Sequence, residues 1–455
     1  MSGLLITVSL PASESAQSAE QSSSTVVVVL AVVIFVGTYV LIAAEWVHRV
    51  AAALIGAALM VVIGATDATS AFFSEDTAID WNVIFLLLGM MIVVSVLRLT
   101  GLFDYLAIWA AKRARGRPFT ILAMLCTITA VASAMLPNVT TVMLVAPVTL
   151  LVCDRLRVRP EGFLIALVMA SNIGGTATLI GDPPNLIIAS KGNLSFNDFL
   201  IHLTPFIIAA FAAFVLLSRW LFRDSFTYDT DRVEAMMRID ERRAIRDPAL
   251  LRRSLAVLAL IILGFVLGST IDVEPSLVAM LGAGLLVVVS RTATADYLAD
   301  VEWPTLVFFM GLFVIVGALV DVGVIDTVGE AAIEAVGDDY LLAATGLLFG
   351  SAALSAIIDN IPYVATVAPL VADLVDASGG APQATALWWA LALGADLGGN
   401  ATAVGASANV VALGIAERNG FPISFWRFTR YGLVVTVVTV AMAWPYLYLR
   451  YYAYS

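Results

Sequence analysis

The chain has 455 residues, of which 61% are hydrophobic and 13% are charged. Soluble domains contain about 45–50% apolar and about 25% charged residues, so this composition excludes an ordinary soluble enzyme. The net charge of −11, from 24 basic and 35 acidic residues, argues against nucleic-acid binding, which needs a basic face. The length would accommodate roughly ten to twelve membrane crossings of about 20 residues each.

Residues 1–21 are rich in Ser, Ala and Glu and contain no Lys or Arg, which predicts a disordered tail outside the cytoplasm. Apolar runs follow between residues 24 and 222 and again between residues 254 and 448. The charged segment 223–253 separates them and is expected to be a cytoplasmic linker. Several runs are short or are broken by Gly and Pro, which is typical of re-entrant and discontinuous membrane helices.

An internal repeat relates the two apolar regions. At shifts of 222 and 224 residues, the matches include Trp81 with Trp303, Asn138 with Asn360, Pro147 with Pro369, Gly174-Gly175 with Gly398-Gly399, and Asn185 with Asn409. Chance would not align Trp, Asn, Pro and Gly residues at two shifts that differ by only two residues. We therefore predict two homologous halves, 22–222 and 254–455.

Charge predicts the orientation of the halves. Segment 112–117 of the first half carries four basic residues, whereas segment 330–339 of the second half carries four acidic and no basic residues. Under the positive-inside rule the two segments lie on opposite sides of the membrane, so the repeats are inverted. We expect an all-α polytopic membrane protein in a bacterial inner (plasma) membrane, with both termini outside.

Each half is expected to cross the lipid bilayer about five times and to hold one re-entrant hairpin and one discontinuous helix. The hairpins are placed at about 118–154 and 340–375. The broken helices are placed at about 162–190 and 384–415. Unwound backbone is tolerated at membrane depth only where it lines a cavity or is buried in protein, so these breaks are expected to mark the transport site.

The hairpin tips are the first candidate site. Pro137 and Asn138 interrupt an apolar run, and Asp359 and Asn360 interrupt the matching run in the second half. A kinked but continuous helix is the alternative interpretation of each break. If the runs are hairpins, helix N-terminal N–H groups and side chains at the tips face the membrane midplane, and the candidate substrate or ion ligands there are Asn138, Thr140, Thr141 and Asn360.

The broken helices are the second candidate site. Carbonyl, hydroxyl and amide oxygens at such breaks are hard ligands suited to Na⁺, although glycines can instead serve close helix packing. The candidate ligands are Gly174, Gly175, Thr176, Thr178 and Asn185 in the first half and Gly398, Gly399, Asn400, Thr402, Ser407 and Asn409 in the second. One Na⁺ site is predicted at Asn138, Thr178 and Asn185, and an inverted mate at Asn360, Thr402 and Asn409. No other cofactor and no zinc site is indicated.

Three acidic residues lie at membrane depth in these breaks: Asp182, Asp359 and Asp396. Ionisable residues at this depth are functional candidates, so the three are predicted to couple protons to transport. Capping of a broken helix is the alternative role for each. No Lys or Arg lies in either break, which favours a cation or a proton as one transported species.

At these residues the sequence resembles the ion transporter superfamily, which includes arsenite permeases, D-type sodium/proton antiporters and citrate transporters. It looks most similar to the branch of the P protein, a melanosomal pigmentation protein, and its bacterial relatives. The strings that carry the resemblance are Val301-Glu302-Trp303, Leu354 to Pro362, Gly174 to Asn185 and Leu397 to Glu417. The resemblance covers nearly the whole chain after residue 22.

The resemblance implies a homodimer in which each protomer has a scaffold domain and a transport domain that moves as an elevator. In carboxylate-transporting relatives each hairpin tip reads Ser-Asn-Thr. Here the tips keep Asn138 and Asn360 but lack both hydroxyl residues, which weakens the expectation of a dicarboxylate substrate.

The favoured function is an ion-coupled secondary transporter, driven by Na⁺ or H⁺, for a small inorganic or organic anion or solute held between the two tips. A Na⁺/H⁺ antiporter is the main alternative. A passive channel is a more remote one. An intramembrane aspartyl protease is the most remote, because position 179 is Leu and breaks the Gly-x-Gly-Asp motif.

Overall fold

The computed structural model describes residues 14–44, 46–74, 77–226, 240–271, 273–291, 297–337 and 339–453, with side chains from residue 25 onward. The regular structure of these residues is helical, as predicted for an all-α protein. Residues 1–13 of the predicted tail and residues 227–239 of the predicted linker lie outside the described part.

Within the described residues, seven helices are long and apolar enough to cross a membrane. They are Thr25–Ala43, Trp81–Leu99, Asn138–Leu156, Thr204–Leu221, Pro248–Ile271, Trp303–Asp321 and Phe425–Tyr451. Shorter apolar helices accompany them, including Pro118–Ser133 and Tyr340–Ser355. This pattern agrees with the predicted polytopic membrane protein in which some helices do not span.

The described chain divides into two compact units. The first unit comprises residues 1–79 and 310–327. It contains α1 (Glu14–Ala43), α2 (Arg49–Val62), α3 (Ala68–Phe73) and the end of α16 (Trp303–Asp321). Within it, a Cβ on Gly311 would lie 3.0 Å from Ala53, so glycine lets α16 approach α2 closely.

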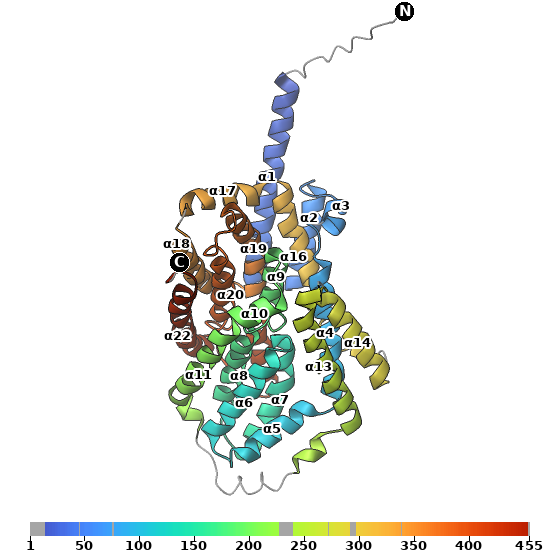
Figure 1. Cartoon of the computed structure of the whole chain (residues 1–455), viewed down its shortest axis with the longest axis vertical. Helices are drawn as coiled ribbons and strands as arrows, with labels where there is room; N and C mark the ends of the chain where they lie inside the picture. The colour runs from blue at the N-terminus through green and yellow to red at the C-terminus, as the bar shows by residue number, and fades with distance from the viewer. Residues whose placement is uncertain are drawn as a thin grey trace, which may run out of the picture. The chain divides into compact units, whose positions relative to one another are not determined.

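The second unit comprises residues 80–309 and 328–455 and holds both predicted hairpins. Its helices before the charged segment are α4 (Trp81–Leu99), α5 (Leu102–Arg113), α6 (Pro118–Ser133), α7 (Asn138–Leu156), α8 (Pro160–Gly175), α9 (Pro183–Gly192), α10 (Phe196–His202) and α11 (Thr204–Leu221). Figure 1 shows α6, α7 and α8 side by side, and they pack pairwise against one another.

After the charged segment, the second unit contains α13 (Pro248–Ile271), α14 (Pro275–Ser290), α18 (Tyr340–Ser355), α19 (Asn360–Ala377), α20 (Ala386–Gly398), α21 (Ser407–Arg418) and α22 (Phe425–Tyr451). The start of α16 and the end of α17 (Val324–Val336) also belong to it. The packing of α18 on α20 matches that of α6 on α8, so the two halves use the same pairs of elements.

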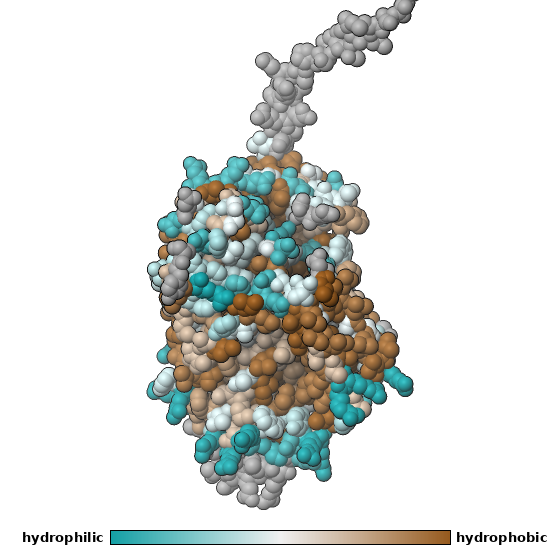
Figure 2. All heavy atoms as spheres, in the orientation of Figure 1, coloured by the Kyte–Doolittle hydropathy of each residue, from teal (hydrophilic) through white to brown (hydrophobic). Residues whose placement is uncertain are grey.

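Apolar side chains cover part of the outer surface of the second unit. On α13 and α14 the exposed residues include Leu263, Leu267, Leu277, Leu281 and Val288. In Figure 2 hydrophobic residues gather over these two helices. A surface of this kind suits contact with lipid.

The part of the charged segment that follows residue 239 is docked on α5. The Arg246 N–H donates to the Thr100 carbonyl at 2.9 Å, and Lys112 pairs with Glu241 of the short 3₁₀ helix η2 (Glu241–Ala244). The hydrogen bond from Lys112 lowers the pKa of Glu241. This portion of the linker is therefore attached to the helical body.

The structure differs from the expected N-terminal tail, because α1 begins at Glu14 and not after residue 21. The segment after Pro11 has no Gly or Pro before Gly37, and Glu, Ala and Gln favour helix. Extension of an existing helix avoids the cost of nucleation, so the span continues into the polar segment. Cys126 and Cys153 are free and buried, as expected.

Candidate functional site

The tips of the two predicted hairpins lie where helices begin. Residues 134–137 separate α6 from α7, and residues 356–359 separate α18 from α19. Asn138 is the first residue of α7 and Asn360 is the first residue of α19. Both are buried, so each break places a carboxamide and helix N-terminal N–H groups inside the second unit.

At the first tip, Asn138 joins three parts of the chain. Its Nδ2 donates to Asp182 Oδ2 at 2.9 Å and to Asn172 Oδ1 at 3.3 Å. Its backbone N–H donates to the Gly181 carbonyl at 3.0 Å. Asn138 therefore links the hairpin to α8 and to the part of the break that directly precedes α9.

At the second tip, Asp359 caps α19 with its carboxylate. Its Oδ1 accepts from the Ile361 N–H at 3.1 Å and its Oδ2 accepts from Ser407 Oγ at 2.6 Å. The neighbouring Asn360 faces Asp182, and its Nδ2 has no hydrogen-bond partner among the described residues. Asp359 thus caps a helix, which is the role predicted as the alternative to proton coupling. Asn360 Nδ2, in contrast, donates to none of the described residues.

The broken helices end and restart next to the hairpins. In the first half the break runs from the end of α8 at Gly175 to Pro183 in α9, and in the second half from Gly398 in α20 to Ser407 in α21. A Cβ on Gly174 would lie 2.3 Å from the Ala130 carbonyl oxygen, and one on Gly398 would lie 2.6 Å from that of Ala352. Glycine is required at both positions for this close approach.

Equivalent hydrogen bonds recur at the two breaks. The hydroxyl groups of Thr178 and Thr402 each donate to a hairpin carbonyl at 2.6 Å. Asn185 Nδ2 donates to the Thr178 carbonyl at 3.0 Å, and Asn409 Nδ2 donates to the Thr402 carbonyl at 2.8 Å. Both threonines attach a break to its own hairpin, and both asparagines attach the second segment of a broken helix to its own break.

Other contacts cross between the halves. Asn172 Nδ2 donates to Asn400 Oδ1 at 3.1 Å and to Asn409 Oδ1 at 3.0 Å. In the opposite direction, the Asp396 carboxyl faces the side chains of Thr176 and Asn185. Hydrogen bonds and side-chain contacts therefore join the broken helix of each half to that of the other half.

We call the resulting cluster the polar core. It consists of eight side chains that are at most 2% exposed: Asn138, Asn172, Asp182, Asn185, Asn360, Asp396, Asn400 and Asn409. Several of its polar atoms have no hydrogen-bond partner among the described residues: Asn185 Oδ1, Asn360 Nδ2, Asn400 Nδ2 and both carboxylate oxygens of Asp396. Buried unpartnered atoms of this number are unusual, and an ordered water or a bound ion could pair with them.

Some predicted residues lie outside the hydrogen bonds of the polar core. Thr140 Oγ1 donates to Glu302 Oε1 at 2.9 Å, and the buried hydroxyl of Thr141 has no hydrogen-bond partner in the described part of the chain. Gly175 and Gly399 contribute backbone and lie against Gly181 and Gly405.

Two residues that contribute contacts were not predicted. Asn172 bridges the halves, and Glu302 accepts from the hairpin residue Thr140. The 224-residue shift places Asn172 on Asp396, so the repeat contained a signal for Asn172. Glu302 precedes a predicted span, and its sequence position alone gave no sign of its partner.

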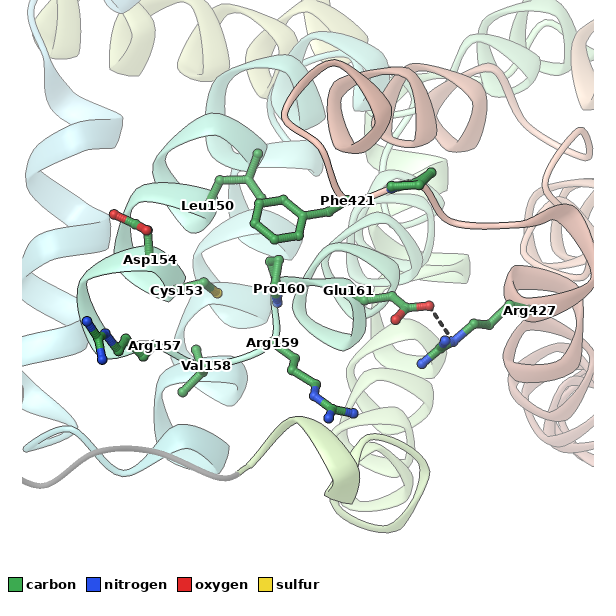
Figure 3. Close-up of a pocket in the computed structure, with 11 residues that line it drawn as sticks. Leu150, Cys153, Asp154, Arg157, Val158, Arg159, Pro160, Glu161, Phe421 and Arg427 are labelled. Atoms are coloured by element: carbon green, nitrogen blue, oxygen red, sulfur yellow. Dashed lines mark ion pairs between the residues drawn. The ribbon is translucent and has the colours of Figure 1, made fainter.

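A separate cavity of about 480 Å³ lies at the other ends of α7 and α8. Arg157, Arg159 and Arg427 line it, and Figure 3 shows Arg427 paired with Glu161. Its α7 residues begin at Leu150, roughly 18 Å along the helix from Asn138 at 1.5 Å per residue. This cavity, which Asp154 and Glu161 also line, is therefore distinct from the polar core.

The sequence model of the citrate transporter family matches residues 39–394. The chain therefore belongs to this family of membrane transporters, within the ion transporter superfamily.

Curated relatives extend the family assignment over most of the chain. An uncharacterized transporter of Mycobacterium bovis is 56% identical over 422 residues, which cover 93% of this chain and 98% of that protein. A 46 kDa membrane protein of Mycobacterium leprae is 52% identical, covering 93% of this chain and 99% of that protein. The human P protein is 35% identical, with 92% of this chain covering 59% of that longer protein.

Two solved structures share the fold at low sequence identity. The YdaH transporter of Alcanivorax borkumensis has a TM-score of 0.56 at 14% identity and covers 94% of this chain and 98% of its own. MtrF of Neisseria gonorrhoeae, described among antimetabolite efflux pumps, has a TM-score of 0.57 at 12% identity and covers 92% of this chain and 98% of its own. These likenesses establish a transporter fold.

Proposed function

We propose that this chain is a secondary active transporter that couples Na⁺ or H⁺ to the movement of a small inorganic or organic anion or solute. Membership of the citrate transporter family supports transport as the function. The polar core supports ion coupling, since it holds two buried carboxylates, Asp182 and Asp396, among carboxamides.

The observation that carries the proposal is the environment of Asp396. Its side chain is 0% exposed, and neither carboxylate oxygen has a hydrogen-bond partner among the described residues. An unpaired buried carboxylate is costly, and a proton or bound cation would remove that cost. A group that needs a cation to be stable at this depth is suited to couple cation movement to a conformational change.

The donors of the polar core support an oxygen-rich cargo. The Nδ2 atoms of Asn360 and Asn400 are buried and have no hydrogen-bond partner within the part of the chain that the structure describes, so they could donate to a carboxylate or another oxyanion. Bound cations near the acidic groups would offset the charge of such a cargo.

Na⁺/H⁺ antiport is the second candidate. Asp182 is close enough to Asp396 and Asp359 for their charges to repel one another. Neighbouring carboxyl groups that exchange protons for Na⁺ would need no further cargo.

The wider mechanism follows the family resemblance. We propose a homodimer in the inner membrane with both termini outside, in which the hairpins and broken helices move as an elevator against a scaffold. The recurrence of hairpin and break contacts in both halves supports two inverted repeats.

Proteoliposomes with a pH-sensitive dye inside would test the function. With the voltage clamped, a Na⁺ gradient is applied alone and then with radiolabelled citrate or other small anions. Uptake that depends on a Na⁺ or H⁺ gradient and shows counterflow is expected, and proton movement without cargo would favour antiport. Solute flux that ignores both gradients and shows no counterflow would indicate a passive channel and contradict the proposal.

A further inference from the structure

The contacts that cross the polar core are related by the repeat, although the residues differ. The 224-residue shift places Asn172 on Asp396 and Asn185 on Asn409. Asn172 faces Asn409 of the other half, and Asp396 faces Asn185 of the other half. The two arrangements are therefore similar but differ at two positions, because Asn172 corresponds to Asp396 and Asn400 corresponds to Thr176.

The arrangement around Asn172 is complete. Its carboxamide has two N–H groups, and they donate to the Oδ1 atoms of Asn400 and Asn409 at 3.1 and 3.0 Å. Both hydrogens of Asn172 Nδ2 are used and both acceptors are filled. No further cation or proton is needed there.

The arrangement around Asp396 is incomplete. Asn185 Oδ1 and both oxygens of Asp396 have no donor among the described residues, although all of them are buried. As a carboxylate, Asp396 has no hydrogen to give. One proton on Asp396 would give this carboxyl group one hydrogen to donate, where Asn172 Nδ2 donates two, and a Na⁺ bound to Asp396 would offset its charge.

The other acidic groups near this place already have donors. Asp182 accepts from Asn138 at 2.9 Å, and Asp359 accepts from Ile361 and Ser407. Asp182 also adds a negative charge that favours a cation beside Asp396.

We propose that the polar core has one exchangeable site for a positive charge, at Asp396 and Asn185, and that the equivalent site in the other half is permanently filled by the carboxamide of Asn172. This inference rests on the proposed function and adds to it the number of exchangeable cation or proton sites in the polar core. It replaces the two symmetric Na⁺ sites that the sequence predicted with a single one, occupied by H⁺ or Na⁺.

Infrared difference spectroscopy on the full chain in lipid would test this without a known cargo. Spectra are compared between acidic and alkaline pH, and at constant pH between NaCl and KCl. The wild type is expected to give a carboxyl signal that the variant Asp396→Asn loses, since Asn would fill the site as Asn172 does. Loss of the signal in NaCl but not in KCl would identify Na⁺ as an occupant, and indifference to both salts would identify H⁺.

Two further variants make the count testable. Asn172→Asp should add a second carboxyl signal. The double variant Asn172→Asp with Asp396→Asn should again give a single carboxyl signal, which now comes from position 172. Glu417→Gln on α21, which removes an exposed carboxyl group, is the matched control and should leave the buried signal unchanged. Thermal unfolding of each variant verifies that it is folded.

An unchanged signal in folded Asp396→Asn, or no added signal in folded Asn172→Asp, would overturn the single-site proposal. These outcomes are independent of the proposed function. A spectrum as expected, together with no gradient-driven flux, would contradict ion-coupled transport and leave the single site standing.

Discussion

Asp182 and Asp396 are both buried, but their surroundings differ. Asp182 accepts a hydrogen bond from Asn138 at 2.9 Å, whereas the oxygens of Asp396 have no partner among the described residues. The two hairpin asparagines differ in the same way, because Asn138 Nδ2 donates two hydrogen bonds and Asn360 Nδ2 has no partner within the described segments. Asn138 and Asn360, which are equivalent in the repeat, therefore have different energetic roles.

This contrast predicts different stability for two alanine variants. Asn138→Ala should lower the free energy of unfolding by about 1–3 kcal/mol, because it leaves buried Asp182 without this donor. Asn360→Ala should lower it by less, since no hydrogen bond of its Nδ2 is lost. Both should abolish coupled flux in proteoliposomes, since both carboxamides lie in the polar core.

Thermal unfolding in detergent, followed alongside flux, would measure both effects. Equal stability losses would contradict the described contacts of Asn138. Wild-type flux in either folded variant would remove that residue from the transport site.

At the scale of elements, the positions of the breaks could be predicted from sequence. Pro137 and Pro183 stand where helices restart, and Gly175 and Gly398 end helices at the predicted places. These residues act locally, since proline removes an N–H donor and glycine permits close backbone approach. Helix breaks that depend on such local effects can therefore be predicted from the sequence.

The contacts between breaks could not be predicted in the same way. The expected ion sites used residues of one half each, but Asn172 donates to Asn400 and Asn409 of the other half. Contacts between the two halves depend on how segments more than 200 residues apart pack together. Neither residue spacing nor helix propensity predicts that packing. The repeat register was the only sequence signal that related Asn172 to Asp396.

The close approach of α8 to α6 leads to a prediction about Gly174. A Cβ there would lie 2.3 Å from the Ala130 carbonyl oxygen, so Gly174→Ala must push the two helices apart. We expect a loss of about 1–3 kcal/mol in stability, as for other overpacked sites. Transport should fall as well, because the break next to Asn172 would shift.

Gly346→Ala on α18 is the control for this substitution. A Cβ at that position meets nothing within 4 Å, and alanine favours helix by about 0.5–1 kcal/mol over glycine. Thermal unfolding of both variants would measure the difference. A Gly174→Ala protein as stable as Gly346→Ala would contradict the close packing.

At the scale of the molecule, the compact units do not coincide with the predicted repeats. Residues 22–79 of the first half and 310–327 of the second half belong to one unit, and the hairpins of both halves belong to the other. Each repeat therefore contributes to both units. This interleaving is compatible with a scaffold and a transport domain that are each built from both halves.

The inverted repeat predicts opposite sides for two equivalent surface segments. Arg115 and Glu334 are both exposed, and the only cysteines of the chain, Cys126 and Cys153, are buried. A thiol introduced at either position should therefore react selectively. Arg115→Cys should react with a membrane-impermeant maleimide only after the membrane is opened, and Glu334→Cys should react in intact cells.

The unsubstituted chain is the control for background labelling. Reaction of both introduced thiols from the same side would contradict inverted topology, whatever the cargo of the transporter.

Under the proposed single site, the filled arrangement at Asn172 limits the electrical work that one transport cycle can draw from the membrane potential, apart from the concentration gradient of the cation itself. One positive charge crossing a potential of about 100 mV gains about 2.3 kcal/mol. That energy supports a concentration ratio of about 50 for a neutral cargo, because 1.4 kcal/mol corresponds to a factor of ten. A cargo with two negative charges, carried with a single cation, would leave the loaded protein with a net negative charge. An inside-negative potential would then oppose uptake and favour export, so under the single-site proposal the amide at position 172 would limit which cargoes this chain can concentrate in the cell.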